Sequence, residues 1–284
     1  MMSKKGYITI AQNTSGTNYV RQAYALALSI KNTQTTVKDF AICVTSKDDV
    51  PEEWAYAFDH IIEIPGEDDA KDKLWKIHNK WKYFEMSPFD ETVVLDADMI
   101  FPTSVDHWWE FLSTTNVFFT SNVHNYKGLV AESDFYRKAI SENKLPNVYT
   151  AFMYFNKSKE AEEMFKMAEL IYKHWEKFYF EYIPLYRPKE VSGDIVFSLA
   201  QHILGMENTI SDIQFPSFVH MKSQMMDIPQ NQITENWIDN IPTYFMDDGS
   251  LKVSNYKQIL PYHYHLKSWL TDDVIEKLEA CYER

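Results

Sequence analysis

Short apolar runs alternate with longer helix-like stretches over the first hundred residues, and this alternation restricts the fold more than any other feature. The runs lie at residues 7–11, 40–45, 61–64 and 93–95 and are rich in β-branched side chains, as expected for buried strands. Residues 17–31, between the first two runs, carry apolar side chains at helical spacing. Strands that alternate with helices predict an α/β fold with a Rossmann-like, largely parallel, doubly wound sheet.

The second half of the chain has a different pattern. We expect strands at residues 117–120 and 150–156, and helices at residues 160–179, 194–204 and 272–282. Neither repeats nor linker-like Gly/Ser tracts interrupt the sequence. The pattern therefore predicts a single domain over residues 1–284, in which a strand–helix half, 1–101, is followed by a more elaborated half, 102–284.

The composition argues against several functions. Only 7 of the 284 residues are glycine, and the sequence has neither a dinucleotide-binding glycine fingerprint nor a phosphate-binding G-x-x-x-x-G-K-[ST] loop. The formal charge is −13, which repels polyanions such as nucleic acids unless the surface carries a local basic rim. Arg137-Lys138 and the pair Arg187 and Lys189 are the candidates for such a rim.

Two features bear on where the protein acts. Cys43 lies in an apolar run far from Cys281, so we expect a buried thiol and not a disulfide, as in a reducing cytoplasm. The apolar stretch after the basic residues 1–6 is too short for a signal peptide, and no apolar run reaches membrane-spanning length. We therefore expect a cytoplasmic protein without a membrane span.

The strongest candidate for a functional site is Asp96-Ala97-Asp98, which directly follows a strongly apolar run. In an open α/β sheet, ligands bind beyond the carboxyl ends of the strands, where this pair of acids would lie. Their oxygens suit Mg²⁺ or Mn²⁺, and either ion would bind a diphosphate. The alternative is that two acids merely end a strand. The apolar strand, the small residue between the acids and the cations Lys80 and Lys82 upstream favour the metal site.

Residues 80–101 resemble the glycosyltransferases of the GT-A fold, and most closely the retaining family of glycogenin-like and lipopolysaccharide galactosyltransferase-like enzymes. That family has a Lys on a helix, an aromatic residue before an Asp, an apolar strand and Asp-Ala-Asp. Here these features are Lys80, Phe89-Asp90 and Asp96-Ala97-Asp98. A divergent, stand-alone member encoded by a phage would also fit this pattern.

The resemblance implies the GT-A fold and a hexosyl- or pentosyltransferase that uses a nucleoside-diphosphate sugar with Mn²⁺ or Mg²⁺. Asp96 and Asp98 would be metal ligands, and Asp96 and Ala97 would also contact the donor. Lys80 would be a catalytic residue at the donor sugar or phosphate, the alternative being a solvated helix lysine. Residues 1–101 would bind the nucleotide, and residues 102–284 would bind the acceptor and supply a C-terminal metal and phosphate element.

Residues 9–13 together with Tyr19 resemble the first strand and loop of the same family. The resemblance implies that Ile10, Gln12, Asn13 and Tyr19 contact the nucleotide. The loop before Tyr19 is longer here than in the family. The alternative interpretation of this segment is a generic first turn between a strand and a helix.

Val191-Ser192-Gly193-Asp194 precedes a predicted helix, and Asp is a favoured N-cap residue. The family has Gly-Asp-Gln at this point, and its Asp contacts the transferred sugar. Gly193-Asp194 matches the first two residues, whereas Ile195 replaces the polar third. The resemblance therefore implies that Asp194 is a second catalytic residue, and the alternative is that its side chain only caps the helix. The family's small-residue element on the acceptor side is absent, and Thr150 and Ala151 stand where it would be.

The segment 261–269 holds two histidines followed by a lysine. His263 and His265 are two residues apart and would share one face of a strand, where an imidazole could complete a metal site begun by two carboxylates. The family has a His, a short spacer and Lys-Pro-Trp. That resemblance implies that His263 is the metal ligand and that Lys267 contacts the diphosphate. His265 and His220, which also begins a His-x-Lys pattern, are the competing ligands.

These features predict metal-dependent transfer of a sugar from a nucleoside-diphosphate sugar to an acceptor hydroxyl, and the resemblance implies retention of the anomeric configuration. The acceptor would be a glycan or glycolipid, or a hydroxylated modified base in DNA. The aromatic side chains between Tyr172 and Tyr186 would belong to the core, to a contact in a homodimer, or to a surface that stacks on sugars or bases. A nucleotidyltransferase that acts on a sugar phosphate and a non-catalytic sugar-binding protein are the alternatives.

Overall fold

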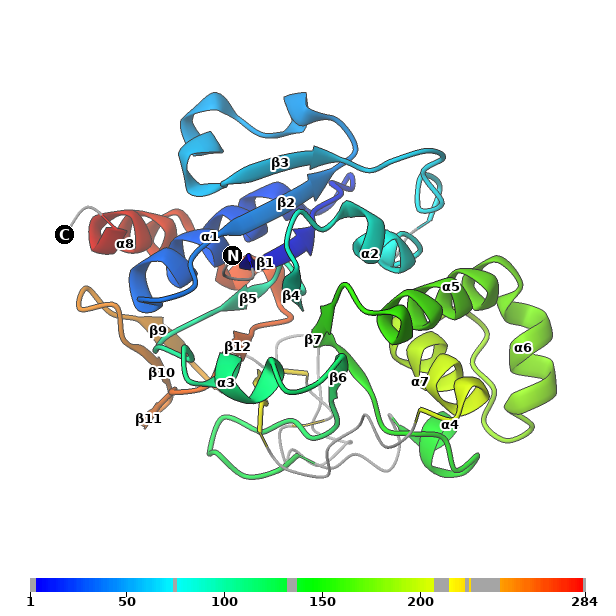
Figure 1. The fold of residues 1–284 in the computed structure, drawn as a ribbon. Helices are drawn as coiled ribbons and strands as arrows, with labels where there is room; N and C mark the ends of the chain where they lie inside the picture. Colours follow the sequence, from blue (N-terminus) through cyan, green and yellow to red (C-terminus); the bar gives the residue numbers. More distant parts are fainter. Residues whose placement is uncertain are drawn as a thin grey trace.

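The core of the protein is a six-stranded sheet with the strand order β3-β2-β1-β4-β7-β6 (Figure 1). The strands are β1 (Lys5–Ile10), β2 (Phe40–Val44), β3 (His60–Glu63), β4 (Glu91–Leu95), β6 (Val117–Thr120) and β7 (Tyr149–Asn156). The structure, a computed structural model, describes residues 4–73, 76–131, 137–206, 215–222, 225 and 241–282. All six strands coincide with the predicted apolar runs, so the α/β class is confirmed.

The strand directions place the site of ligand binding. β1 pairs in parallel with β2 and β4, and β2 pairs in parallel with β3. β7 is antiparallel to both β4 and β6. The sheet is therefore largely parallel, with one reversed strand. The strand order reverses between β1 and β4, and open α/β sheets bind ligands beyond the carboxyl ends of the strands at such a point.

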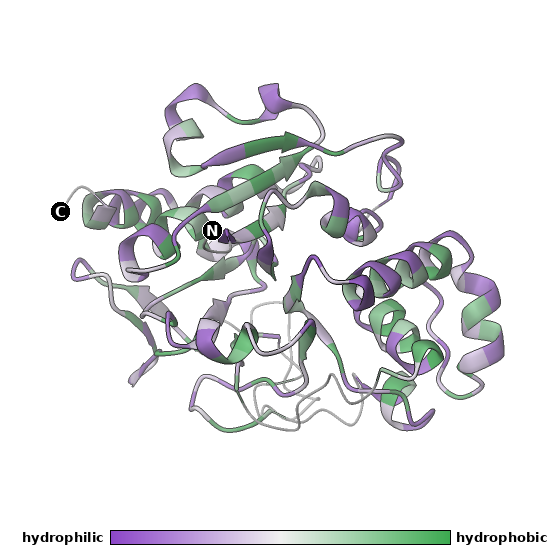
Figure 2. Cartoon of the chain, in the orientation of Figure 1, coloured by the Kyte–Doolittle hydropathy of each residue, from purple (hydrophilic) through white to green (hydrophobic). Residues whose placement is uncertain are grey.

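Alternate side chains of the central strands supply two hydrophobic layers, one on each face of the sheet. Tyr7 and Ile42 pack on the face covered by helices α1 (Tyr19–Thr33) and α8 (Asp272–Tyr282). Ile8 and Cys43 pack on the face covered by α5 (Lys159–Lys173) and α7 (Gly193–Leu204). Figure 1 shows α1 and α8 together on one side of the sheet and α4 to α7 gathered on the other. Figure 2 shows the hydrophobic residues of the central strands between these layers. This is the doubly wound arrangement that the sequence predicts.

The helices of the described residues vary in length. They are α1 (Tyr19–Thr33), α2 (Tyr83–Met86), α3 (Trp108–Leu112), α4 (Lys138–Ser141), α5 (Lys159–Lys173), α6 (Trp175–Tyr182), α7 (Gly193–Leu204) and α8 (Asp272–Tyr282). Within the described ranges, no helix combines the length and apolar character needed to cross a membrane.

Two small three-stranded sheets complete the fold. The first has the order β5-β12-β8 and is built from β5 (Met99–Ile100), β12 (Tyr262–His263) and β8 (Val219–His220). The second is antiparallel and consists of β9 (Thr243–Phe245), β10 (Leu251–Val253) and β11 (Tyr256–Lys257). In the first sheet β12 pairs with β5 directly after the Asp96-Ala97-Asp98 segment. A strand from the C-terminal part of the chain therefore lies beside the end of β4.

The prediction of one continuous helix over residues 160–179 is wrong. The chain leaves the helical conformation at His174, so that α5 ends and α6 begins there. The break lets Tyr179 lie in the core, where its hydroxyl accepts a hydrogen bond of 3.0 Å from the backbone N–H of Ser192. Tertiary packing overrides helical propensity at this point.

The predictions for the cysteines and for part of the aromatic cluster are confirmed. Cys43 and Cys281 are free thiols, and Cys43 is fully buried. Tyr172 and Tyr179 belong to the hydrophobic core. The other interpretations of the cluster stay open for its exposed members, which include Phe180 and Tyr186.

The contact between Gly6 and Phe89 generates a stability prediction. A Cβ atom on Gly6 would lie 2.4 Å from the Phe89 ring, which is buried in the core. We expect Gly6→Ala to lower the free energy of unfolding by about 1–3 kcal/mol, the usual cost of overpacking, as measured by urea denaturation. Gly16→Ala is the matched control, because no atom lies within 4 Å of its Cβ position. Equal effects of the two substitutions would contradict the packing argument.

Candidate functional site

A cavity of about 360 Å³ lies beyond the carboxyl ends of β1 and β4, at the point where the strand order reverses. Both halves of the chain line it. The lining includes Ile10, Gln12 and Tyr19 from the first strand–helix unit, Lys80, Asp96-Ala97-Asp98, Tyr149-Thr150-Ala151 at the start of β7, Val191 to Asp194 before and within α7, and His220, Lys222, His263, His265 and Lys267 from the C-terminal part.

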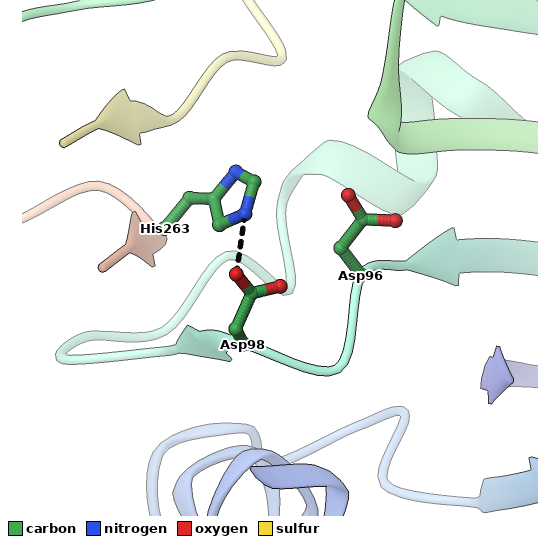
Figure 3. Close-up of side chains that lie close together, drawn as sticks. All are labelled: Asp96, Asp98 and His263. Atoms are coloured by element: carbon green, nitrogen blue, oxygen red, sulfur yellow. Dashed lines mark hydrogen bonds and ion pairs between the residues drawn. The ribbon is translucent and has the colours of Figure 1, made fainter. Parts of the chain in front are cut away.

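Asp98 and His263 both line this cavity, and their side chains are in direct contact (Figure 3). The antiparallel pairing of β5 with β12 sets Met99 opposite His263, and the His263 Nε2 atom lies 2.9 Å from Asp98 Oδ2. The Lys267 ammonium donates to the same carboxylate oxygen. Burial alone would raise the pKa of the Asp98 carboxyl, but the charges of His263 and Lys267 and the His263 hydrogen bond outweigh it and hold that pKa well below its ordinary value.

Asp96 faces the same space from the end of β4 (Figure 3). One ligand atom from each of Asp96, Asp98 and His263 lies within 4.8 Å of the other two. Two carboxylates and one imidazole are a donor set that suits Mn²⁺ or Mg²⁺. The residues therefore fit a divalent cation, and His263 is the histidine that meets the two carboxylates.

Lys80 forms an ion pair with Asp96. Its ammonium lies 2.7 Å from Asp96 Oδ1 and 3.2 Å from the hydroxyl of Thr150. The Lys80 side chain is only 8% exposed. The alternative that Lys80 is a solvated helix lysine is therefore wrong, because its aliphatic part is buried and its charge points into the cavity.

The two competing histidines stack on the first. β8 pairs in parallel with β12, which sets His220 beside His263 with ring centroids 4.8 Å apart. The His265 ring lies 5.2 Å from that of His263 at an interplanar angle of 8°. Burial, with His263 nearby, lowers the pKa of His265 to about 3 and lowers that of His220 well below its ordinary value. Both rings are therefore neutral near pH 7 and pack as aromatic neighbours of His263.

The backbone of His265 brings Lys267 back to Asp98. His265 has a φ of +52°, a left-handed conformation that residues other than glycine rarely adopt. The expectation that His263 and His265 share a face of one strand is therefore wrong, because β12 ends at His263. The turn that follows starts a short 3₁₀ helix at Lys267. Strained backbone of this kind is concentrated at functional sites.

The four residues predicted to contact the nucleotide separate into two groups. Ile10, Gln12 and Tyr19 line the cavity. Burial, with the nearby carboxylates Asp98 and Asp96, raises the pKa of Tyr19 to about 12. Asn13 lies differently, because its side chain is exposed and accepts a hydrogen bond of 3.1 Å from the Val20 N–H at the start of α1.

Gln12 is also engaged inside the protein. Its amide nitrogen donates to Asp68 Oδ2 at 2.9 Å and to the Thr45 hydroxyl at 3.1 Å, and its oxygen accepts from Asn79 at 2.8 Å. Asp68 and Asn79 are bonded to each other as well. This network anchors the segment around Asp68 to the end of β1, so the Gln12 side chain is held in place where it lines the cavity.

Asp194 also lines the cavity and does not act as an N-cap. Helix α7 begins at Gly193 after the N-cap residue Ser192, so Asp194 lies inside its first turn. Its Oδ1 accepts from the N–H and the hydroxyl of Thr150, each at 2.9 Å, and its Oδ2 accepts from Arg137 at 2.6 Å. Burial would raise the pKa of Asp194, but Arg137, the Thr150 N–H bond and Lys80 outweigh it and lower that pKa.

The sequence pattern did not predict the contacts that Arg137 and Thr150 make with Asp194. Arg137 was a candidate for an exposed basic rim, yet it is buried, and that expectation is wrong. Thr150 joins Lys80 to Asp194 through its hydroxyl. A lone Arg next to Lys138 and a Thr at the start of a strand have no spacing signal, so only the fold reveals them.

Comparisons with known proteins agree with this architecture. No family model matches the sequence, and no curated protein matches it significantly. The structure is similar to that of the glycosyltransferase GlyE of Streptococcus pneumoniae TIGR4, with a TM-score of 0.51 and 12% identity over 98% of this chain and 60% of that one. It is also similar to the galactosyltransferase LgtC in complex with donor and acceptor sugar analogs, with a TM-score of 0.53 and 11% identity over 97% of this chain and 95% of that one.

The chain therefore spans less than two thirds of the length of GlyE and nearly the whole length of LgtC. The likeness shows that this chain has the GT-A fold of those two proteins, as its sequence predicts.

The Asp98 carboxyl generates a prediction about stability and pH. Its folded-state pKa is depressed, so its contribution is complete above the unfolded-state pKa of about 3.9 and is lost as the pH falls through the folded-state value. In urea denaturation with a chelator, Asp98→Asn should therefore lose less free energy of unfolding than the wild type as the pH falls below about 5. The exposed Asp48→Asn is the control and should follow the wild type. An Asp98→Asn curve parallel to the wild type would refute this.

Proposed function

We propose that the protein is a metal-dependent glycosyltransferase that moves a sugar from a nucleoside-diphosphate sugar to an acceptor hydroxyl. The observation that carries this proposal is the convergence of Asp96, Asp98 and His263 in a cavity beyond the carboxyl end of β4. The likeness to GlyE and LgtC supports it at the level of the fold.

The metal end of the cavity is suited to a leaving diphosphate. When bound to Asp96, Asp98 and His263, Mn²⁺ or Mg²⁺ supplies positive charge and acts as a Lewis acid toward the diphosphate. Lys267 adds a second positive charge at this end, where it contacts Asp98 and lies 5.8 Å from the centroid of the Tyr19 ring. A fixed cation stabilises the negative charge that develops on the leaving group.

The other end of the cavity is suited to the transferred sugar. A carboxylate has about four lone-pair positions, and the contacts with Arg137 and Thr150 occupy three of those on Asp194. The remaining position accepts a hydroxyl of the sugar. Lys80, held between Asp96 and Thr150, lies between this end and the metal end and contributes charge to both.

The same contacts support retention of the anomeric configuration. Inversion needs a carboxylate base at the acceptor hydroxyl, and Asp194, bound to Arg137 and Thr150 with a lowered pKa, is a poor base. Ile195, the next residue, is apolar and buried. With neither residue serving as that base, the leaving phosphate takes the proton of the acceptor hydroxyl, and the acceptor oxygen bonds to the anomeric carbon on the face that the phosphate has just left.

We favour a glycan or glycolipid over modified DNA as the acceptor. Arg137 is buried in an ion pair, so of the two basic pairs only Arg187 and Lys189 are exposed. A chain with a formal charge of −13 needs a larger basic surface to hold a polyanion. A neutral sugar acceptor needs no such surface.

The alternatives have less support. A nucleotidyltransferase would need a glycine-rich loop after the first strand, where the sequence has only Gly16. A non-catalytic sugar-binding protein has no need of a carboxylate pair with its own cations in the same cavity. The two free thiols, Cys43 and Cys281, support action in a reducing compartment such as the cytoplasm.

A donor screen tests the enzyme claim. The wild type with Mn²⁺ should release nucleoside diphosphate from at least one of UDP-glucose, UDP-galactose, GDP-mannose and dTDP-glucose, and a chelator should abolish this release. Asp98→Asn should reduce it by about 100-fold or more, because a metal ion contributes several kcal/mol to such a step. Asp90→Asn, an exposed acid before β4, is the matched control and should keep full activity. No release by the wild type from any donor would remove the claim.

The transfer product tests the acceptor class and the stereochemistry together. With the active donor, oligosaccharide acceptors should be glycosylated and hydroxymethylated duplex DNA should not. Proton NMR of the first product should show the anomeric configuration of the donor sugar. An inverted anomer would refute retention, and transfer to the DNA alone would refute the glycan proposal.

A further inference from the structure

Arg137 is held rigidly beneath the sugar end of the cavity. Its Nη1 atom donates to Asp194 Oδ2 at 2.6 Å. Its Nε and Nη2 atoms donate to the side-chain oxygen of Asn147 at 3.0 and 2.6 Å, and Nη2 also donates to the Val148 carbonyl. The guanidinium carbon lies 4.0 Å from the centroid of the Tyr149 ring. These contacts fix the direction from which the guanidinium meets Asp194.

The contacts continue from Arg137 to the metal end. Asp194 accepts both the N–H and the hydroxyl of Thr150 through one oxygen. Because the Thr150 hydroxyl donates to Asp194, its lone pairs are directed to the Lys80 ammonium, 3.2 Å away. Lys80 in turn lies 2.7 Å from Asp96. A continuous chain of hydrogen bonds therefore connects Arg137 with Asp96 through Asp194, Thr150 and Lys80.

Gly193 makes this close arrangement possible. A Cβ atom there would lie 3.1 Å from the Thr150 hydroxyl oxygen and 3.3 Å from the hydroxyl of Tyr172. Both distances are shorter than ordinary contacts to a Cβ atom. The backbone before Asp194 therefore lies as near to Thr150 as a glycine allows.

We propose that Arg137 is a positioning residue for the transferred sugar, which acts by holding the Asp194 carboxylate, and through Thr150 the Lys80 ammonium, in the arrangement that receives the donor. The inference rests on the proposed function and extends it to a residue that does not line the cavity as Asp194 and Thr150 do. Arg137 makes no contact with the sugar and takes no part in the bond changes.

The charge on Arg137 matters because only 16% of the Asp194 side chain is exposed. Removing one partner of a buried ion pair leaves an uncompensated charge and is strongly destabilising. The charged and titratable groups that face Asp194 come from several elements, namely Arg137, Lys80, Lys222, Tyr149, Tyr172 and Tyr179. Arg137 is the one in direct ion-pair contact with it. Without Arg137 the pKa of Asp194 rises, and the carboxylate is protonated at a higher pH.

Calorimetry of binding separates the sugar end from the nucleotide end. The probes are UDP-glucose, GDP-mannose and dTDP-glucose with Mn²⁺, each compared with its free nucleoside diphosphate. Arg137→Met should bind the free diphosphate as the wild type does. Its affinity for the nucleotide sugar should fall by about tenfold to 100-fold, the range for loss of a hydrogen bond to a charged group. Lys138→Met, at the next residue, is the matched control and should match the wild type for both ligands.

A double-mutant cycle tests whether Arg137 acts through Asp194. In kcat/KM, Arg137→Met and Asp194→Asn should each cost about tenfold to 100-fold, and Arg137→Met should add little in the Asp194→Asn background, because coupled residues are not additive. Arg137→Met should also move the acid limb of the pH profile to higher pH. Arg137→Lys should restore part of the lost kcat/KM and part of the wild-type pH profile. The double variant has no uncompensated buried charge, so it keeps the test valid if Arg137→Met alone folds poorly.

The outcomes distinguish the inference from the proposed function. Two results with a wild type that binds a donor would overturn the inference and leave the proposed function standing. In the first, Arg137→Met weakens the binding of the free diphosphate and of the donor equally. In the second, Arg137→Met lowers kcat/KM as much in the Asp194→Asn background as in the wild type. If the wild type binds none of the donors, the proposed function fails and the inference fails with it.

Discussion

The cavity depends on the pairing of one buried and two partly buried carboxylates with cations from distant parts of the chain. Burying a carboxylate without a partner costs several kcal/mol. Each of these acids is therefore stable in its position only when its cationic partner is also in place. The ion pairs are Asp96 with Lys80, Asp98 with Lys267 and Asp194 with Arg137. Lys267 lies 169 residues from its partner in the sequence and Arg137 lies 57 residues from its own. Formation of the cavity therefore requires both halves of the chain to fold together.

The sheet and the metal end were predictable because their signals are local. A strand that is buried on both faces has to be apolar throughout, so β1, β2 and β4 are visible as short runs. The acids follow one of these runs directly, and the rule for open α/β sheets then places them at the ligand-binding edge. His263 and Lys267 could be proposed from the sequence only through the resemblance to a family. Composition and spacing alone left His220 and His265 as competing candidates for the same metal ligand.

Other parts were not predictable because they depend on tertiary contacts. β8 and β12 have two residues each, which is too short for any periodic pattern, yet their pairing decides that His220 stacks on His263. The helix over 160–179 breaks at His174 without Gly or Pro, because Tyr179 gains a buried contact by the break. Asn13 stands in a loop that matches the family's pattern, but its side chain serves the start of α1.

The position of Thr150 follows from the direction of β7. The rule that ligands bind beyond the carboxyl ends of strands applies to parallel strands, and by that rule the start of β7 would lie far from the site. β7 is antiparallel to β4, and Leu95 pairs with Phe152, so the residues that begin β7 lie beside the end of β4. The N–H of Asp96 accordingly donates to the Ala151 carbonyl at 3.1 Å. One reversed strand therefore supplies the only hydroxyl that, within the described residues, is bonded to both Lys80 and Asp194. The Asp96 and Asp194 ends of the cavity are therefore joined by strand direction, which local sequence patterns do not encode.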